Sequence, residues 1–261
     1  MKNTMKIFTV FTFLLITSFM IAQNDNRGFE IAQESEMADN GWNSSEMELM
    51  MTLKNKSGQE TIRKLRGIMI EVENDGDKSL VVFDNPTDVK GTASLVYTHK
   101  TGSDDQWLYL PALKRIKRIS SRNKSGPFMG SEFAFEDMAS QEIEKYEHKF
   151  IEASKANDEE CYLVERYPVD KKSGYKRQQV WFNKGNYRIE KIDYYDRKDQ
   201  LIKTLTYSGY KSYKDKFWRA DKMVMVNHRT GKETVIEYLF HRLDIGLTDN
   251  DFSQNSLKNV K

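Results

Sequence analysis

The sequence predicts a mainly β protein whose antiparallel strands form a sheet that curls or closes. Segments of alternating apolar and polar residues recur along most of the chain after residue 43, and this period of two is typical of half-buried strands. Turn sequences such as Asn74-Asp75-Gly76-Asp77 separate successive segments at short intervals. The 261-residue chain shows neither an internal repeat nor a long linker, so it is expected to fold as one antiparallel unit.

Residues 1–22 have the layout of a secretory signal peptide and are expected to lie outside the fold. Lys2 and Lys6 precede an apolar run from Ile7 to Ala22, and the chain then becomes abruptly polar. The alternative is a membrane anchor, but the run is shorter than the ~20 apolar residues that a spanning helix needs. No cysteine stands directly after the run, and Cys161 is far downstream. We therefore expect a soluble periplasmic protein without a lipid anchor, with residues 23–261 forming a single domain.

A short amphipathic helix is expected over residues 26–40, followed directly by the first β-hairpin. Phe29, Ile31 and Met37 form a weak helical stripe that ends near Asn40-Gly41. The hairpin strands alternate around the turn at residues 55–58. Their apolar positions, on one parity within each strand, are Met47, Leu49, Met51 and Leu53, then Ile62, Ile68, Ile70 and Val72.

The same alternation predicts strands along the rest of the chain. They are expected at residues 79–86, 93–99, 105–111, 115–120, 145–153, 159–168, 176–184, 187–196, 201–210, 221–228 and 233–243. The exception is residues 121–142, a glycine-punctuated segment rich in phenylalanine and methionine. Two interpretations are open for this segment: a plug that fills the end of a curled sheet, or a mobile lid over an apolar cavity.

Composition and charge argue against several classes of function. The 41 basic and 39 acidic residues nearly balance, whereas nucleic-acid binders show a basic excess. One cysteine and four scattered histidines give no zinc-site spacing, so no metal and no cofactor is expected. The sequence contains no nucleophile elbow and no phosphate-binding glycine motif. The prediction is a binding protein rather than an enzyme.

Aromatic residues and methionines point to an apolar ligand. Trp107, Tyr109, Trp181 and Trp218 lie on expected strands or at their ends, and the 12 methionines supply adaptable apolar surface. Ordinary core packing accounts for most of these side chains. A curled sheet with more inward apolar residues than its own core requires could nevertheless enclose an acyl-chain cavity.

Four segments resemble the bacterial outer-membrane lipoprotein-sorting family, the LolA-like proteins, in a largely uncharacterised branch. They are GDKSLVVFDNPTDVKGTASL, DQWLYLPALKRIKRIS, NKSGPFMGSEFAFEDM and MVNHRTGKET. The resemblance implies an open, strongly curved antiparallel half-barrel around an apolar cavity, covered by helices or loops, in the periplasm. It favours the lid interpretation of residues 121–142, and it implies a carrier that shields lipoprotein acyl chains or another lipid from water.

The resulting hypothesis is a monomeric periplasmic carrier that binds acyl chains inside a bent sheet. The alternative is a module that carries nothing and docks on an inner-membrane transporter of the resistance-nodulation-division type through a basic run. The expected cavity and lid residues are Met47, Leu49, Met51, Leu53, Leu95, Tyr97, Trp107, Tyr109, Phe128, Met129, Phe133 and Phe135. The expected partner or headgroup contacts are Lys114, Arg115, Lys117 and Arg118.

Overall fold

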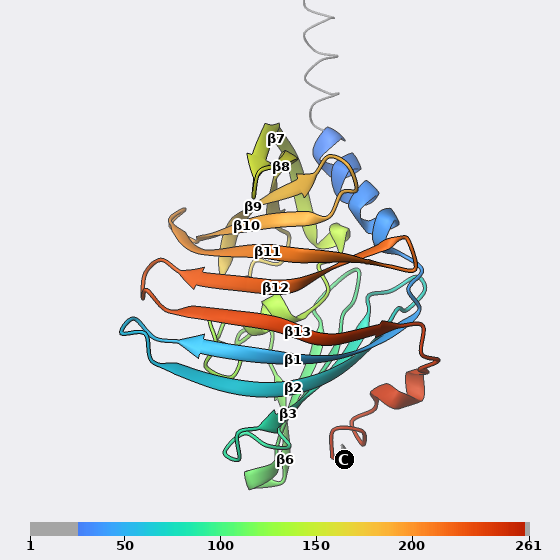
Figure 1. Ribbon diagram of the computed structural model, residues 1–261, viewed down its shortest axis with the longest axis vertical. Helices are drawn as coiled ribbons and strands as arrows, with labels where there is room; N and C mark the ends of the chain where they lie inside the picture. Colours follow the sequence, from blue (N-terminus) through green and yellow to red (C-terminus); the bar gives the residue numbers. More distant parts are fainter. Residues whose placement is uncertain (1–25, 259–261) are drawn as a thin grey trace, which may run out of the picture.

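Thirteen antiparallel strands form one open, strongly curved sheet in the computed structural model, which describes residues 26–258 (Figure 1). The half-barrel predicted from the sequence is confirmed. The strands are β1 (Ser44–Lys54), β2 (Glu60–Ile70), β3 (Lys78–Asn85), β4 (Ala93–Tyr97), β5 (Asp105–Leu110), β6 (Arg115–Ile119), β7 (Tyr146–Ala156), β8 (Glu159–Pro168), β9 (Tyr175–Asn183), β10 (Ile189–Asp196), β11 (Leu201–Tyr213), β12 (Phe217–Asn227) and β13 (Glu233–Leu243).

Four short 3-10 helices and one α-helix complete the described secondary structure. The α-helix covers residues 26–39, which confirms the helix expected over residues 26–40. The 3-10 helices are η1 (Pro111–Leu113), η2 (Phe135–Met138), η3 (Ile143–Lys145) and η4 (Asp249–Phe252). The predicted signal peptide, residues 1–22, lies outside the described residues.

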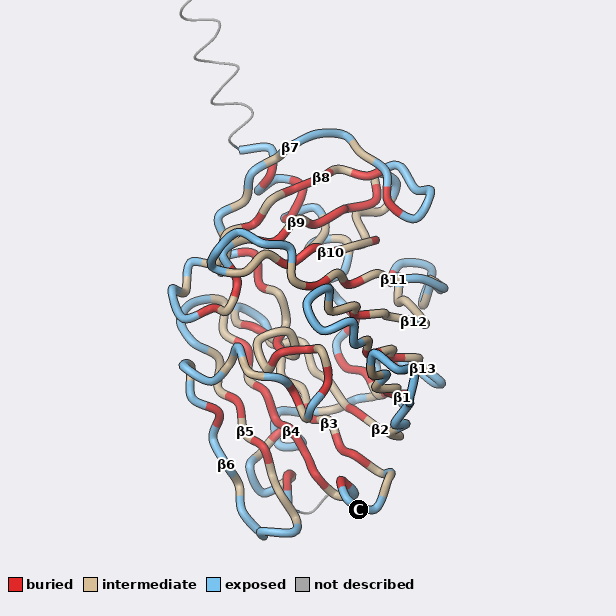
Figure 2. Tube along the Cα trace, turned by 90° about the vertical axis from the view of Figure 1, so that its left-hand side faces the viewer, coloured by how far each residue is buried: buried red, intermediate tan, exposed pale blue. Residues whose placement is uncertain are grey.

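The order of the strands places the first and last ones at the middle of the sheet. It runs β6-β5-β4-β3-β2-β1-β13-β12-β11-β10-β9-β8-β7, so β1 pairs with β13 while β6 and β7 form the two edges. β6 and β7 are consecutive in the sequence, and residues 120–145, here called the connecting segment, join them across the opening (Figure 2). The connecting segment therefore has to cross the concave side of the sheet.

The main core lies between the concave face and the connecting segment. Met51, Leu65 and Val180 from the sheet pack in one cluster with Phe128 and Phe133 from the connecting segment. The parity expected for β1 is confirmed, because Met47, Leu49 and Met51 all belong to this cluster and Leu53 packs against it. Apolar side chains from both halves of the sheet and from the segment that joins them thus bury one another.

A second apolar cluster lies on the opposite face of β2 to β5. Val81 and Phe83 contact the main core, whereas their neighbours Leu80 and Val82 belong to the second cluster, as the alternation of side chains along a strand requires. The C-terminal residues Phe252 and Leu257 cover this face. Ile68 and Ile70 also point to this side, so the apolar parity recognised in β2 faces away from the concavity.

The N-terminal helix packs across one end of the concave side. Ile31 and Ala32 are buried, and Ser35 Oγ donates a hydrogen bond to the Tyr187 carbonyl at 2.8 Å. Gly28 sits against the backbone of β7, where a Cβ atom would lie 2.6 Å from the nitrogen of Phe150. Only glycine permits this close approach. The helix is therefore fixed at both of its ends over the hollow of the sheet.

Candidate ligand cavity

Two adjoining cavities lie between the N-terminal helix and the concave side of the sheet. The larger has a volume of about 700 Å³ and a polar lining, and the smaller has a volume of about 400 Å³ and a mainly apolar lining. We call them the polar cavity and the apolar cavity. Ser35, Trp42 and Gln141 line both, so the two spaces meet under the helix. Their sizes fall in the range of small-molecule sites, about 300–1,000 Å³.

Methionines and aromatic residues from both halves of the sheet line the apolar cavity. They are Met47, Met69, Met223, Tyr207, Tyr210, Tyr238, Trp42 and Trp218. Burial raises the pKa of the phenols of Tyr207 and Tyr238. Burial also lowers the pKa of His241 to about 4, so this imidazole is neutral at ordinary pH. These side chains give the cavity an uncharged surface for an apolar ligand, although Asp39, Asp77, Arg188, Lys216 and Arg219 also line it.

Carboxyl groups dominate the polar cavity. They belong to Glu36, Asp39, Glu71, Glu73, Asp75, Asp77 and Glu142. Burial, together with the charge of Glu71, raises the pKa of Asp77 to about 6. Burial and the charges of Asp77 and Glu36 raise the pKa of Glu142 to about 7. Burial is the larger cause of both shifts, and the neighbouring carboxylates add to it.

Arg166 is a buried cation on the wall of the polar cavity. It is 3% exposed, and its Nε and Nη2 donate hydrogen bonds to the side-chain oxygens of Gln178 at 2.6 Å and Gln141 at 3.1 Å. Its guanidinium also lies over the Tyr146 ring, 4.6 Å from the centroid. Among the described residues no carboxylate pairs with it. A buried guanidinium without a counter-ion favours an anionic or strongly polar ligand group.

His148, which lines the same cavity, has a buried ring nitrogen without a hydrogen-bond partner in residues 26–258. Its Nε2 lies 3.0 Å from the Ile143 carbonyl, which can only accept, so Nε2 carries the proton. The other ring nitrogen, Nδ1, is buried without a partner among the described residues. Burial lowers the pKa of His148. Nδ1 is therefore an unsatisfied acceptor that is shielded from solvent.

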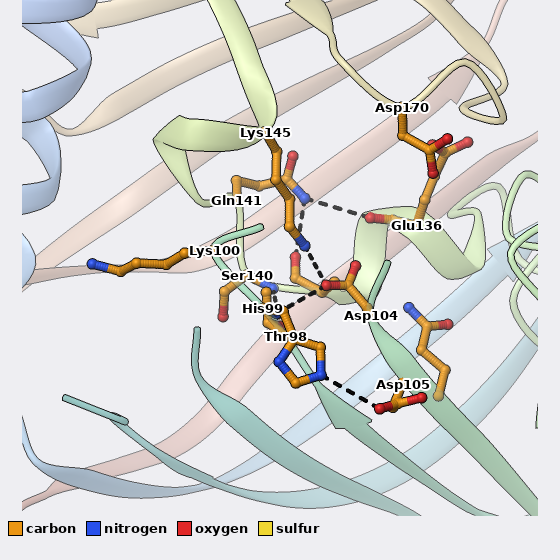
Figure 3. Close-up of polar contacts among 12 residues, drawn as sticks. Thr98, His99, Lys100, Asp104, Asp105, Glu136, Ser140, Gln141, Lys145 and Asp170 are labelled. Carbon is orange, nitrogen blue, oxygen red and sulfur yellow. Dashed lines mark hydrogen bonds and ion pairs between the residues drawn. The ribbon is translucent and has the colours of Figure 1, made fainter. Parts of the chain in front are cut away.

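Polar contacts fix the end of the connecting segment beside these cavities (Figure 3). Lys145 pairs with Asp104, and the Ser140 amide donates to the Thr98 hydroxyl at 3.1 Å. His99 lies between two carboxylates, with Nδ1 2.8 Å from Asp75 Oδ2. The contacts of Ser140 and Lys145 hold residues 140–145 in place as one wall of the polar cavity.

The connecting segment fills the concavity rather than covering a space beneath it, which corrects the lid interpretation. Phe128 is 0% exposed and Phe133 is 3% exposed, and both belong to the main core with Met129 and Phe135 packed against them. The segment is a plug held by the sheet. Its four apolar residues contribute to packing, and the open space lies beyond them, under the N-terminal helix.

The structure places only one of the other predicted cavity residues at the cavities. Met47 lines the apolar cavity, while Leu49, Met51 and Leu53 pack into the core. Leu95, Tyr97, Trp107 and Tyr109 belong to the second apolar cluster, on the opposite face of the sheet. This is a correction: the alternation identified residues that share a face, but it did not indicate which face is concave.

The predicted basic contacts lie on the edge of the sheet. Lys114, Arg115, Lys117 and Arg118 are exposed on or next to β6, and Arg118 pairs with Asp105. They lie apart from the two cavities, which none of them lines. Sequence reasoning missed Met69, Met223, Tyr207, Tyr238 and Arg166. Their strands were predicted, so the missing information was the curvature that brings these strands to one cavity.

An open half-barrel with cavities of ligand size on its concave side is a LolA-like fold. The sequence identity to two solved structures is high enough to place the chain in a family. It belongs to the outer-membrane lipoprotein-sorting family. Within residues 26–258, no helix is both long and apolar enough to cross a membrane.

Solved structures support this assignment. An outer membrane lipoprotein-sorting protein domain from Vibrio parahaemolyticus is 53% identical, with a TM-score of 0.88 over 90% of this chain and 100% of that one. A DUF1329 family protein from Desulfovibrio piger is 30% identical, with a TM-score of 0.84 over 90% and 99% of the two chains.

The remaining comparisons support the fold but give no further information on function. A LolA superfamily protein from Nitrosomonas europaea shares the fold, at 20% identity and a TM-score of 0.70 over 88% and 98% of the chains. A family model described as "Uncharacterized protein" matches residues 75–259. A comparison with curated proteins found no match.

Proposed function

We propose that this protein is a periplasmic carrier of an amphiphile, such as the acylated end of a lipoprotein, and that it binds without catalysis. The acyl part lies in the apolar cavity and the polar part lies in the polar cavity. The observation that carries the proposal is the junction of these two cavities under the N-terminal helix. A single amphiphile has the same division into an apolar and a polar part.

The energy of binding comes from the acyl chain. Each methylene group removed from water contributes ~0.8 kcal/mol, so a few buried groups suffice for stable loading. Specificity comes from polar partners such as the guanidinium of Arg166, which lines the polar cavity. Release requires the N-terminal helix to move or a receptor with a better cavity, because unaided escape returns the chain to water.

Two neighbouring positions on the helix provide a matched test. Ala38 lines the apolar cavity, whereas Met37 is 50% exposed and lines neither cavity. Ala38→Trp is expected to fill the cavity and to abolish loading of a fluorescent fatty-acyl probe. Met37→Trp, which adds the same ring on the outer side, is expected to load normally.

Native mass spectrometry of the protein purified from the periplasm complements this test and identifies any bound lipid. Equal probe loading by the Ala38→Trp and Met37→Trp variants would contradict the proposed position of the acyl chain. Protein that is free of lipid when isolated and that also fails to bind the probe would contradict the carrier function.

The second candidate function is docking on an envelope transporter, and the exposed basic edge strand β6 favours it. Lys114 and Arg115 make no ion pair with any described residue, so their charges are available to an acidic partner. Reversal to Lys114→Glu and Arg115→Glu is expected to weaken capture of the partner in a pull-down from solubilised envelopes while leaving probe loading intact. Unchanged capture would indicate that this basic run is an ordinary solvent-exposed edge without a role in binding.

A further inference from the structure

Two cationic side chains are almost fully buried within residues 26–258, those of Arg166 and Lys203. Lys203 has a counter-ion, because its ammonium lies 2.7 Å from a carboxylate oxygen of Asp137. Arg166 is 3% exposed and forms no ion pair with any described carboxylate. A buried charge without a partner is costly, so a ligand that supplies the opposite charge gains free energy at Arg166.

Neutral contacts hold the Arg166 guanidinium in one orientation. Its Nε and Nη2 donate hydrogen bonds to Gln178 Oε1 at 2.6 Å and to Gln141 Oε1 at 3.1 Å. The Tyr146 hydroxyl donates to the same Gln141 oxygen at 2.7 Å, and the guanidinium lies over the Tyr146 ring. These contacts fix the planar fork without neutralising its charge. A fixed fork of this kind suits a carboxylate or a phosphate group.

The third guanidinium nitrogen, Nη1, remains available to a ligand. It makes no hydrogen bond with any residue between 26 and 258, and it is not among the unpartnered atoms of this range that are closed off from solvent. Arg166 lines the polar cavity, and its partner Gln141 lines both cavities. The free N–H groups therefore lie close to the junction between the polar and the apolar space.

The carboxyl groups of the polar cavity restrict the charge that such a ligand can carry. They repel an anion, and a group with two negative charges is repelled more strongly than a group with one. Burial and neighbouring carboxylates raise the pKa of Glu142 to about 7, so this group is partly protonated near neutral pH and repels less. A phosphate diester or a carboxylate, with one negative charge, fits the cavity better than a phosphate monoester, which approaches two.

We propose that the bound amphiphile carries a singly charged oxyanion, a phosphate diester or a carboxylate, and that Arg166 binds this group where the two cavities meet. The inference rests on the proposed carrier function and adds the chemical class of the ligand. The acyl chain extends from the anion into the apolar cavity. The paired charge gives a preference between headgroups that the acyl chain by itself cannot give.

Two lipids with the same acyl chain test the assignment. Lauroyl lysophosphatidylglycerol carries a phosphate diester, whereas monolauroylglycerol carries no charge. Lipid-free wild-type protein, titrated calorimetrically with each lipid below its critical micelle concentration, is expected to bind the charged lipid ~10–100-fold more tightly. This is the range for hydrogen bonds to a charged group.

Substitutions assign the preference to one cation. Arg166→Met removes the charge at a similar side-chain length and should abolish the preference by weakening only the binding of the charged lipid. Arg166→Lys should restore part of it, because an ammonium keeps the charge but not the fork. Lys100 also lines the polar cavity, and Lys100→Met is the matched control, expected to change the preference by less than ~5-fold. Circular dichroism checks that each variant is folded, and the comparison of the two lipids on wild-type protein needs no variant.

The outcomes separate this inference from the carrier function. Equal affinity of wild-type protein for the two lipids would overturn the anion site and leave the carrier function intact, whereas failure to bind either lipid would contradict both. A preference that persists in folded Arg166→Met, or that Lys100→Met abolishes, would overturn the assignment to Arg166. Glycerophosphoglycerol, the same headgroup without an acyl chain, should compete poorly. Competition as strong as that of the intact lipid would show a site for a free anion and overturn the assignment to an amphiphile.

Discussion

At the scale of single residues, hydrogen bonds between ionisable side chains shift the pKa of a few groups. His99 is one of them, since both ring nitrogens face carboxylates, with Nδ1 2.8 Å from Asp75 and Nε2 3.4 Å from Asp105. Figure 3 shows the contact with Asp105. The hydrogen bond with Asp75 raises the pKa of His99. The same bond lowers the pKa of Asp75 to about 2. The imidazolium thus links the turn after β2 to the start of β5.

This link makes stability depend on pH in a defined direction. A raised histidine pKa means that the folded state holds the proton more tightly. The stabilisation is therefore complete below the unfolded pKa of ~6.5 and is lost as pH rises through the folded pKa. His99→Gln is expected to lower the melting temperature at about pH 6, by an amount equivalent to ~0.5–1 kcal/mol for this solvent-screened group. At about pH 9 the variant and the wild type should differ less.

Thermal unfolding monitored by circular dichroism measures this difference. His228→Gln changes an exposed histidine and serves as the control. A difference between His99→Gln and wild type that grows with rising pH would show that the sign is wrong.

At the scale of elements, the connecting segment depends on a buried ion pair for its position. Lys203 on β11 lies 2.7 Å from Asp137, and their side chains are 7% and 5% exposed. Asp137 also accepts a hydrogen bond from the Tyr175 hydroxyl at 2.9 Å, and Lys203 donates one to the Glu132 carbonyl at 3.1 Å. Every charge in the pair is thus satisfied, and the plug is tied to the concave face.

Removal of one partner leaves the other buried and unpaired. Lys203→Met is expected to lower the free energy of unfolding by about 3–5 kcal/mol, as measured by urea denaturation. The double variant Lys203→Met with Asp137→Asn should recover much of this loss, because it removes the uncompensated charge. A single variant as stable as wild type would mean that the plug is held by its phenylalanines alone.

At the scale of the whole molecule, a sheet with apolar side chains on both faces needs a separate cover over each face. The connecting segment covers the concave face, and the C-terminal residues cover the opposite face over β2 to β5. Phe252 is the anchor of the outer cover, at 0% exposed. The two edges of the sheet need a different protection. The edge strand β6 presents charged side chains, which discourage pairing with another sheet.

Truncation of the outer anchor is expected to be costly. Phe252→Ala should lower the free energy of unfolding by about 3–5 kcal/mol and expose the apolar cluster that includes Leu95 and Trp107 to solvent. Chemical denaturation and binding of a hydrophobic dye measure the two effects. Phe240→Ala, at a side chain that is 43% exposed, should change stability by less than ~0.5 kcal/mol. Equal effects of both changes would contradict the role of the C-terminal cover.

Much of the fold could be predicted because its signals are local. Alternation and turn residues located the strands, the helical stripe located residues 26–39, and the cluster of phenylalanines marked residues 121–142 as unusual. The candidate site could not be predicted in the same way. Met47 was identified from its parity on β1, but Met223 and Arg166, which line the cavities, come from strands far apart in the sequence.

The sequence by itself determined which residues form strands, which of them share a face, and the resemblance to a family of half-barrels. Only the tertiary structure decided which face is concave, that residues 120–145 fill the hollow, and that the open space lies under the N-terminal helix. The physical reason is that alternation fixes side-chain direction relative to neighbouring residues along the same strand. Curvature, and the cavity it leaves, depends on packing between residues that are distant in the chain.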